Sequence, residues 1–231
     1  NMAKDKLKRW AENKTFPHVF EPPLLPIIKE GKTFMQGEWR EKFFKNDNPL
    51  VIELGCGKGE YTVQLAEANP HINYLGVDVK GHRFNHGARI AIAKGLKNVA
   101  FLRTRVEFIE SFFGPNEVDE IWLTFSDPQP KDETGIKRIT SSYFWNKYRN
   151  FLKPNGTIHI KHDNPMIYWS ALEELEATRH ILETHSADVY GDYIQTQPEK
   201  WQRILSIRTF YESRWLGEGK KIHYVRFRTQ F

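Results

Sequence analysis

The chain has 231 residues, of which 39% are hydrophobic, 27% charged and 14% aromatic. This length can bury one sizeable core, and the hydrophobic content excludes a disordered protein. The net charge of +5 is compatible with a polyanionic partner, and the single cysteine excludes an intramolecular disulfide framework and a cysteine-rich zinc site. No apolar run reaches membrane-spanning length. We expect no secretory signal, no membrane partner, a cytoplasmic location and a native start at Met2.

Residues 1–48 have the composition of an extension that precedes the main domain. Basic residues between Lys4 and Lys14 predict a short helix, and prolines between Pro17 and Pro26 predict an extended strap after it. Two interpretations stay open: the segment packs on the domain through its aromatic side chains, or it forms an arm that contacts phosphates. Residues 49–231 alternate between strand and helix patterns without internal repeats, so we expect them to form a single domain.

A glycine-rich loop follows the first strand of this domain. An apolar run from Leu50 leads to Gly55, Gly57 and Gly59, and a helical apolar pattern begins directly afterwards. This order predicts a buried parallel strand, a tight loop and a helix, which is the first unit of a doubly wound α/β sheet. Glycines let a ligand approach the backbone closely, and the loop delivers that ligand to the positive end of the helix.

The spacing of the loop distinguishes two classes of cofactor. A dinucleotide-binding loop has its third glycine at the sixth position of the motif, where this chain has Glu60. Glu53 stands two residues before the first glycine. The resulting E-x-G-x-G-x-G spacing resembles motif I of the S-adenosylmethionine-dependent methyltransferases. A carboxylate at Glu53 suits a ligand that carries an amino group and a sulfonium.

Carboxylates also follow the carboxyl ends of later strands. Residues 72–79 predict the second strand, and Asp78 at its end can accept both hydrogens of a ribose diol. A helix over residues 83–95 and a strand over residues 98–102 come next. A strand over residues 118–126 then leads to Asp127, which is followed by Pro128 and Pro130. Ligands of open α/β sheets lie beyond the carboxyl ends of the strands, so we expect Asp78 and Asp127 to face one crevice.

The remaining pattern predicts a helix over residues 141–152 and a strand over residues 157–161, joined by a turn at Pro154-Asn155-Gly156. The spacing of the helix predicts burial of its large side chains, which are Tyr143, Phe144, Tyr148, Phe151 and Leu152. We interpret this stripe as core rather than as a platform for stacking bases.

Four motifs in this order resemble the tRNA (guanine-N7-)-methyltransferases. They are Asp127-Pro-Gln-Pro-Lys131, Lys137-Arg138, Ile160-Lys-His-Asp163-Asn164 and Thr209-Phe-Tyr-Glu212-Ser-Arg214. The resemblance covers about residues 50–231. It implies a class I methyltransferase fold, with a mostly parallel, seven-stranded, Rossmann-like sheet and helices on both faces. It also implies methyl transfer from S-adenosyl-L-methionine to N7 of the guanosine at position 46 in the tRNA variable loop.

The resemblance further implies roles for individual residues. Asp127 would be the catalytic residue. The cofactor would be bound by Glu53, Gly55, Gly57, Gly59, Asp78, Arg105 and Asp127. The substrate would be bound by Lys131, Asp163, Thr209, Phe210, Tyr211 and Glu212. Two positions depart from the family pattern: Arg105 stands where the family usually has an aspartate near the adenine, and Gln129 stands where it has a tryptophan. Arginine has no acceptor, so Arg105 would contact the cofactor through its backbone or by stacking.

The chemistry of the expected substrate explains why carboxylates and lysines recur in these motifs. Guanine N7 has a lone pair and no proton, so the reaction needs alignment and electrostatics rather than a general base. A carboxylate can pair with the adjacent N–H donors of guanine, and Asp127, Asp163 and Glu212 are the candidates. Lys131, Lys137, Arg138 and Lys161 can contact phosphates. We expect the target base to leave its stack to reach the cofactor.

Two other functions stay open from the sequence. An NAD-dependent oxidoreductase would use the same fold, but the glycine spacing argues against it. A non-catalytic RNA-binding module could keep the fold, and Arg105 is the residue that most favours this interpretation. We expect no metal, because the histidines lack a metal-binding spacing. The chain is expected to be a monomer or a homodimer.

Overall fold

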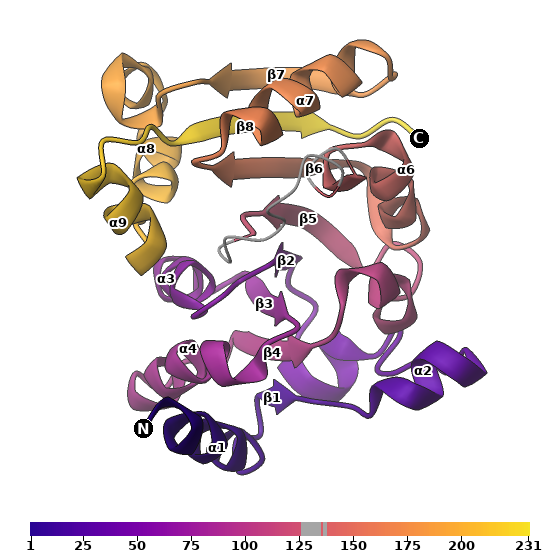
Figure 1. Ribbon diagram of the computed structural model, residues 1–231. Helices are drawn as coiled ribbons and strands as arrows, with labels where there is room; N and C mark the ends of the chain where they lie inside the picture. The colour runs from indigo at the N-terminus through magenta and orange to yellow at the C-terminus, as the bar shows by residue number, and fades with distance from the viewer. Residues whose placement is uncertain (126–134, 136–137) are drawn as a thin grey trace.

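The computed structural model describes residues 1–125, 135 and 138–231, and in them one eight-stranded sheet has the order β1-β4-β3-β2-β5-β6-β8-β7 (Figure 1). The strands are β1 (Val19–Phe20), β2 (Leu50–Leu54), β3 (Asn73–Asp78), β4 (Val99–Arg103), β5 (Val118–Leu123), β6 (Leu152–His162), β7 (Ile181–Ser186) and β8 (His223–Arg228). All pairings from β1 to β6 are parallel, and β8 runs antiparallel between β6 and β7.

This sheet confirms the predicted α/β class, with one strand more than the seven expected. The additional strand is β1, a two-residue segment of the N-terminal region in which Val19 pairs with Phe101 of β4. The division of the chain after residue 48 stays a prediction. The strand order reverses beside β2, so the carboxyl ends of β2, β3 and β5 frame a crevice at the switch point.

Helices cover both faces of the sheet. They are α1 (Met2–Asn13), α2 (Leu24–Glu30), α3 (Glu60–Ala68), α4 (Gly81–Ala93), α6 (Ser142–Trp145), α7 (Pro165–Glu176), α8 (Glu199–Leu205) and α9 (Phe210–Gly217). Shorter 3-10 or π turns are η1 (Trp39–Phe44), η2 (Val106–Phe112), η3 (Asn146–Asn150), η4 (Val189–Tyr193) and η5 (Ile194–Thr196). Among the described residues, no helix has both the length and the apolar character that a membrane crossing needs.

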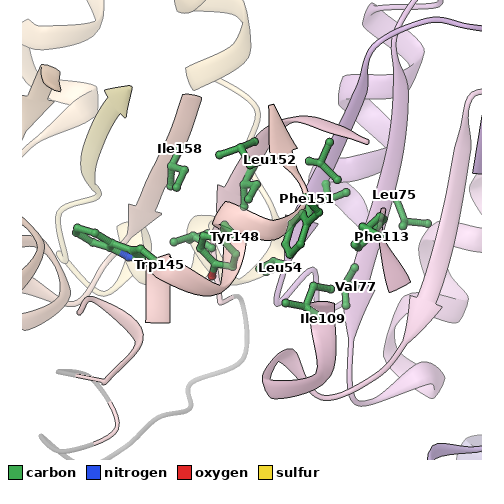
Figure 2. Close-up of a cluster of buried hydrophobic side chains, with 14 of the residues drawn as sticks. Leu54, Leu75, Val77, Ile109, Phe113, Trp145, Tyr148, Phe151, Leu152 and Ile158 are labelled. Carbon is green, nitrogen blue, oxygen red and sulfur yellow. The ribbon is translucent and has the colours of Figure 1, made fainter. Parts of the chain in front are cut away.

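Two hydrophobic clusters, one on each side of the sheet, account for its stability. Alternate residues of a strand point to opposite faces, so Ile52 and Leu54 enter one cluster while Val51 enters the other. Figure 2 shows part of the first cluster, in which Leu54 and Val77 of the sheet lie near Ile109 and Phe151. Burying both faces of parallel strands holds the carboxyl ends of β2 and β3 in fixed positions.

The N-terminal region is bound to the sheet by both polar and apolar contacts. Helix α1 lies beside α4 (Figure 1), where the Asn13 amide donates to the Gly81 carbonyl at 2.8 Å. Trp39 of η1 is fully buried, and its indole N–H donates to the Phe112 carbonyl at 2.7 Å. The predicted basic helix is confirmed. The interpretation that this region packs on the domain named Trp10, Phe16 and Phe20. Phe16 and Phe20 do pack against the two clusters, whereas Trp10 is 37% exposed.

The region between β5 and β6 differs from the prediction in two respects. The expected helix over residues 141–152 divides into α6 and the 3-10 turn η3, and Tyr143 is 68% exposed, so its predicted burial is wrong. Helical periodicity turns Phe144 and Tyr148 inward and leaves Tyr143 at the outer edge of the stripe. The expected turn before β6 is instead an irregularity within the strand, where Asn155 has a φ of +60°.

Candidate active site

The glycine loop between β2 and α3 leaves no room for side chains at two of its positions. Gly55 and Gly59 have φ angles of +75° and +77°, which other residues rarely adopt. A Cβ at Gly55 would lie 2.6 Å from the Phe125 Cα, and one at Gly59 would lie 2.6 Å from the Phe101 ring. The Gly55 amide donates to the Val77 carbonyl at 2.9 Å, which fastens the loop to β3. Both positions therefore require glycine and present bare backbone, and Gly55 borders a cleft.

Asp78 is the last residue of β3, and its carboxylate is fixed beside this loop. It accepts hydrogen bonds from the backbone N–H groups of Gly57 and Lys80, each at 2.9 Å. Asp78 is 4% exposed and lines a cleft that reaches the carboxyl ends of the strands. Its position agrees with the predicted contact to ribose hydroxyls.

Glu53 lies beneath the loop rather than in the cleft. It is 2% exposed, and it accepts hydrogen bonds from the hydroxyls of Thr62 and Thr124 at 2.5 and 2.6 Å. Burial raises the pKa of Glu53 to about 7, although the two threonine hydroxyls oppose the rise; the charge of Asp78 adds to it. A cationic ligand above the loop would favour the ionised form of Glu53.

The cleft has a volume of about 730 Å³, within the range of small-molecule sites. It brings together Gly55, Asp78 and Arg105, three of the predicted cofactor residues, with Arg138. Much of its described wall is apolar: Val79, Val106, Phe125, Ile139 and Phe144 line it, together with Thr104, Glu107 and Gly135. A bare-backbone loop, a carboxylate for a diol and apolar walls fit a ligand that combines an amino acid with a nucleoside.

At the end of β6, Asp163 belongs to a polar group that connects two strand ends. One Asp163 oxygen lies 3.1 Å from His162 Nδ1 and the other 3.4 Å from Lys220 Nζ. Nε2 of His162 lies 3.2 Å from the carbonyl of Phe125, two residues beyond the end of β5. Burial raises the pKa of Asp163, but His162 and Lys220 lower it more, so the net pKa is below its ordinary value. Asp163 therefore stays anionic at neutral pH.

Helix α9 begins against the glycine loop, 150 residues away in sequence. The Thr209 hydroxyl accepts from the Glu212 N–H at 3.1 Å and caps the helix. The Phe210 N–H donates to the Glu60 carboxylate at 3.1 and 3.2 Å, and Lys58 Nζ lies 3.8 Å from the centroid of the Phe210 ring. The Glu60 carboxylate thus lies at the amino ends of both α3 and α9, where helix dipoles favour a negative charge.

Glu212 and Lys161 form a buried ion pair behind this contact. Lys161 Nζ lies 3.2 Å from the Glu212 carboxylate and donates to the Leu205 carbonyl at 2.9 Å, while the Tyr190 hydroxyl donates to Glu212. Burial lowers the pKa of Lys161, and Glu212 opposes this shift. Lys161 is 3% exposed, so its predicted contact with phosphate is wrong. A direct bond between Glu212 and a base would require the ion pair to open.

Comparisons with known proteins identify the family. A family model described as "Putative methyltransferase" matches residues 47–225. The tRNA (guanine-N(7)-)-methyltransferase of Bacteroides thetaiotaomicron is 46% identical over 228 residues, which cover 98% of this chain and 86% of that protein. The protein of the same name from Christiangramia forsetii is 44% identical over 227 residues, with 98% of each chain covered. The chain belongs to the tRNA (guanine-N7-)-methyltransferase family.

Solved structures place this tRNA (guanine-N7-)-methyltransferase family member within a wider fold. The 16S rRNA methyltransferase KamB superimposes with a TM-score of 0.59 at 14% identity, over 84% of this chain and 93% of that one. The antibiotic-resistance methyltransferase Kmr gives 0.52 at 15% identity, over 79% and 87%. At these identities only the fold is shared. Fold and family together argue against the NAD-dependent oxidoreductase.

The described residues of this methyltransferase bring most of the predicted site to one edge of the sheet. Gly55, Asp78 and Arg105 line the cleft, Asp163 lies at the end of β6, and Thr209 caps the helix that contacts the loop. Asp127, Lys131 and Lys137 lie outside the described residues. The sequence reasoning missed Lys58, Glu60 and Glu107; the Thr209-x-x-Glu212 spacing is that of a helix cap and could have located the start of α9.

Proposed function

We propose that the chain transfers a methyl group from S-adenosyl-L-methionine to N7 of the guanosine at position 46 in the variable loop of tRNA. Family membership supports the reaction, and the arrangement of Gly55, Asp78 and the apolar walls in one cleft supports the cofactor. When bound, the cofactor supplies an electrophilic methyl group. The observation that carries the proposal is the bare-backbone glycine loop directly beside the fixed carboxylate of Asp78.

Different residues around the cleft would bind different parts of the cofactor. The loop of Gly55, Gly57 and Gly59 would hold the amino acid part, with the positive end of α3 facing the carboxylate. Asp78 would accept the ribose hydroxyls. Glu53, beneath the loop, would stabilise the cationic amino group through its negative charge, since that charge is favoured once a cation lies near.

The substrate side would lie beyond β5 and β6. Asp163 stays anionic, so it can accept from the N–H donors of guanine and favour the cationic product. Asp127 and Lys131 keep the roles predicted from their motif, as catalytic residue and substrate contact, although both lie outside the described residues. Thr209, Phe210 and Tyr211 would border the target base, and Glu212 would act by holding α9 against the loop rather than by touching the base.

Cationic side chains around the cleft would position the RNA. Arg138 lines the cleft and can contact a phosphate near the target nucleotide, which fixes the position of the RNA without reading its sequence. The net charge of +5 favours association with a polyanion. We place the reaction in the cytoplasm, and both a monomer and a homodimer are compatible with it.

A methyl-transfer assay tests this function. Unmodified tRNA transcript is incubated with the protein and methyl-labelled S-adenosylmethionine, beside a transcript in which guanosine 46 is replaced by adenosine. We expect one methyl group per tRNA on the first transcript and none on the second. Stable binding of tRNA and cofactor without transfer would instead support the non-catalytic RNA-binding module. Asp47→Ala serves as a control for site variants, since Asp47 is exposed at the amino end of β2, away from the cleft.

A further inference from the structure

The cleft contains a carboxylate that the proposed function leaves unused. Glu107 lies in the first turn of η2, is exposed, and lines the cleft beside Arg105 and Val106. Asp78 is the other carboxylate among the described lining residues, and backbone N–H groups hold it in place. Within the described parts of the chain, no hydrogen bond or ion pair engages the Glu107 carboxylate. A charged acceptor in a ligand cleft without a protein partner is available to a ligand.

The walls near Glu107 suit a flat heterocycle. Val79 directly follows Asp78 and is 44% exposed, an unusual state for a large apolar residue at the end of a buried strand. Val79, Val106 and Ile139 all line the same cleft as Glu107. A ligand whose ribose reaches Asp78 would therefore extend its base between apolar side chains, toward the segment that carries Glu107.

We propose that the Glu107 carboxylate accepts a hydrogen bond from the exocyclic amino group of the cofactor's adenine, with Val79 and Val106 against the ring. This inference rests on the proposed use of S-adenosylmethionine. The guanidinium of Arg105 has only donors, so it cannot accept from an amino group. A carboxylate has only acceptors when ionised, and it would reject a base that presents a carbonyl oxygen at the same position. Glu107 thereby makes the cleft selective for adenine.

Calorimetric binding of two probes tests the assignment without any methyl transfer. S-adenosyl-L-homocysteine presents the amino group, and S-inosyl-L-homocysteine presents a carbonyl oxygen in its place. The wild-type protein should bind the adenosyl probe at least about tenfold more tightly, as expected for a lost hydrogen bond and an unpaired acceptor. In Glu107→Gln the amide can also donate to the carbonyl oxygen, so the preference should fall by about tenfold. In Glu107→Ala it should fall similarly through weaker binding of the adenosyl probe.

Glu110→Gln is the matched control. Glu110 lies on the same 3-10 turn but contacts Lys147 and Asn150 instead of lining the cleft, so this variant should keep the wild-type preference. An unchanged preference in both Glu107 variants would overturn the assignment while leaving the proposed function intact. Failure of the wild-type protein to bind S-adenosyl-L-homocysteine at all would overturn both the assignment and the proposed cofactor.

Discussion

At the scale of single residues, Asp78 connects the glycine loop to the ribose. Asp78→Ala should weaken S-adenosylmethionine binding by roughly 1.5–3 kcal/mol, about 10- to 150-fold, because a charged acceptor is lost. Asp78→Asn keeps one acceptor and should lose less affinity. Calorimetry measures the cofactor affinity of both variants. Asp47→Ala is the control, because Asp47 is exposed and lies away from the cleft. Unchanged affinity in a folded Asp78→Ala protein would remove this residue from the site.

Glu53 makes the stability of the ligand-free protein depend on pH. Its folded pKa of about 7 exceeds the ordinary value of 4.5, so between these values the folded state binds more protons than the unfolded state. Protonated Glu53 therefore contributes roughly 3 kcal/mol to the free energy of unfolding. This contribution is complete below about pH 4.5 and is lost as the pH rises through 7. Urea unfolding of wild type and Glu53→Gln at pH 5 and pH 8 should show this loss in wild type alone. If the free energies of unfolding of wild type and Glu53→Gln changed equally with pH, the raised pKa of Glu53 would be contradicted.

At the scale of elements, the Lys161–Glu212 pair fastens α9 to the sheet. Lys161→Met leaves the buried Glu212 carboxylate without its cation and should lower the free energy of unfolding by about 3–5 kcal/mol. The double variant with Glu212→Leu removes both charges and should recover most of this loss. Urea unfolding measures both effects.

The pair between Lys94 and Glu67 provides the comparison for this prediction. Both of its side chains are 47% exposed, so Lys94→Met should cost under about 1 kcal/mol. If Lys161→Met costs no more than Lys94→Met, the ion pair does not hold α9 in place.

The same elements show how far sequence reasoning can reach. Strands β2 to β5 were predictable from their apolar runs. Gly55 directly follows β2 and Asp78 ends β3, and these two residues mark the sheet edge that carries the site. The roles of Lys161 and Glu212 were not predictable, because burial depends on which distant segments cover a residue. Lys161 lies within a strand whose pattern does not reveal that Leu205 and Glu212 close over it. Contacts of this kind arise from tertiary packing.

At the scale of the whole molecule, the position of the RNA depends on cations near the cleft. Arg138→Ala should weaken tRNA binding and reduce the slope of log K against log salt by somewhat under one unit, because one phosphate contact is lost. Lys97→Ala is the control, since Lys97 is exposed next to the amino end of β4, at the opposite edge of the sheet. Equal slopes for wild type and Arg138→Ala would place the RNA elsewhere, such as along the basic helix α1.

The residue pattern predicted the strands and helices between residues 50 and 162. The strands after residue 162 followed only from the family resemblance, and the contribution of residues 1–48 was missed. Their prolines and basic residues indicated an extension, yet Val19 pairs with β4 and Trp39 is fully buried in the first cluster. A two-residue strand leaves no periodic signal, and a single buried tryptophan leaves none either. The position of the cleft at the carboxyl ends of the strands was predictable. The role of Glu107 was not, because only the structure shows which residues line the cleft beside it.

We propose that this cleft directs a methyl group to N7 of one guanine in tRNA. The most direct test is single-turnover transfer from S-adenosylmethionine to two tRNAs that differ at position 46, one carrying guanosine and the other 7-deazaguanosine. The second base has carbon in place of N7 and therefore no lone pair to attack the methyl group. We predict full transfer to the first tRNA, with the methyl group mapped to that base, and no transfer to the second. Equal transfer to both tRNAs would show that the methyl group does not go to N7.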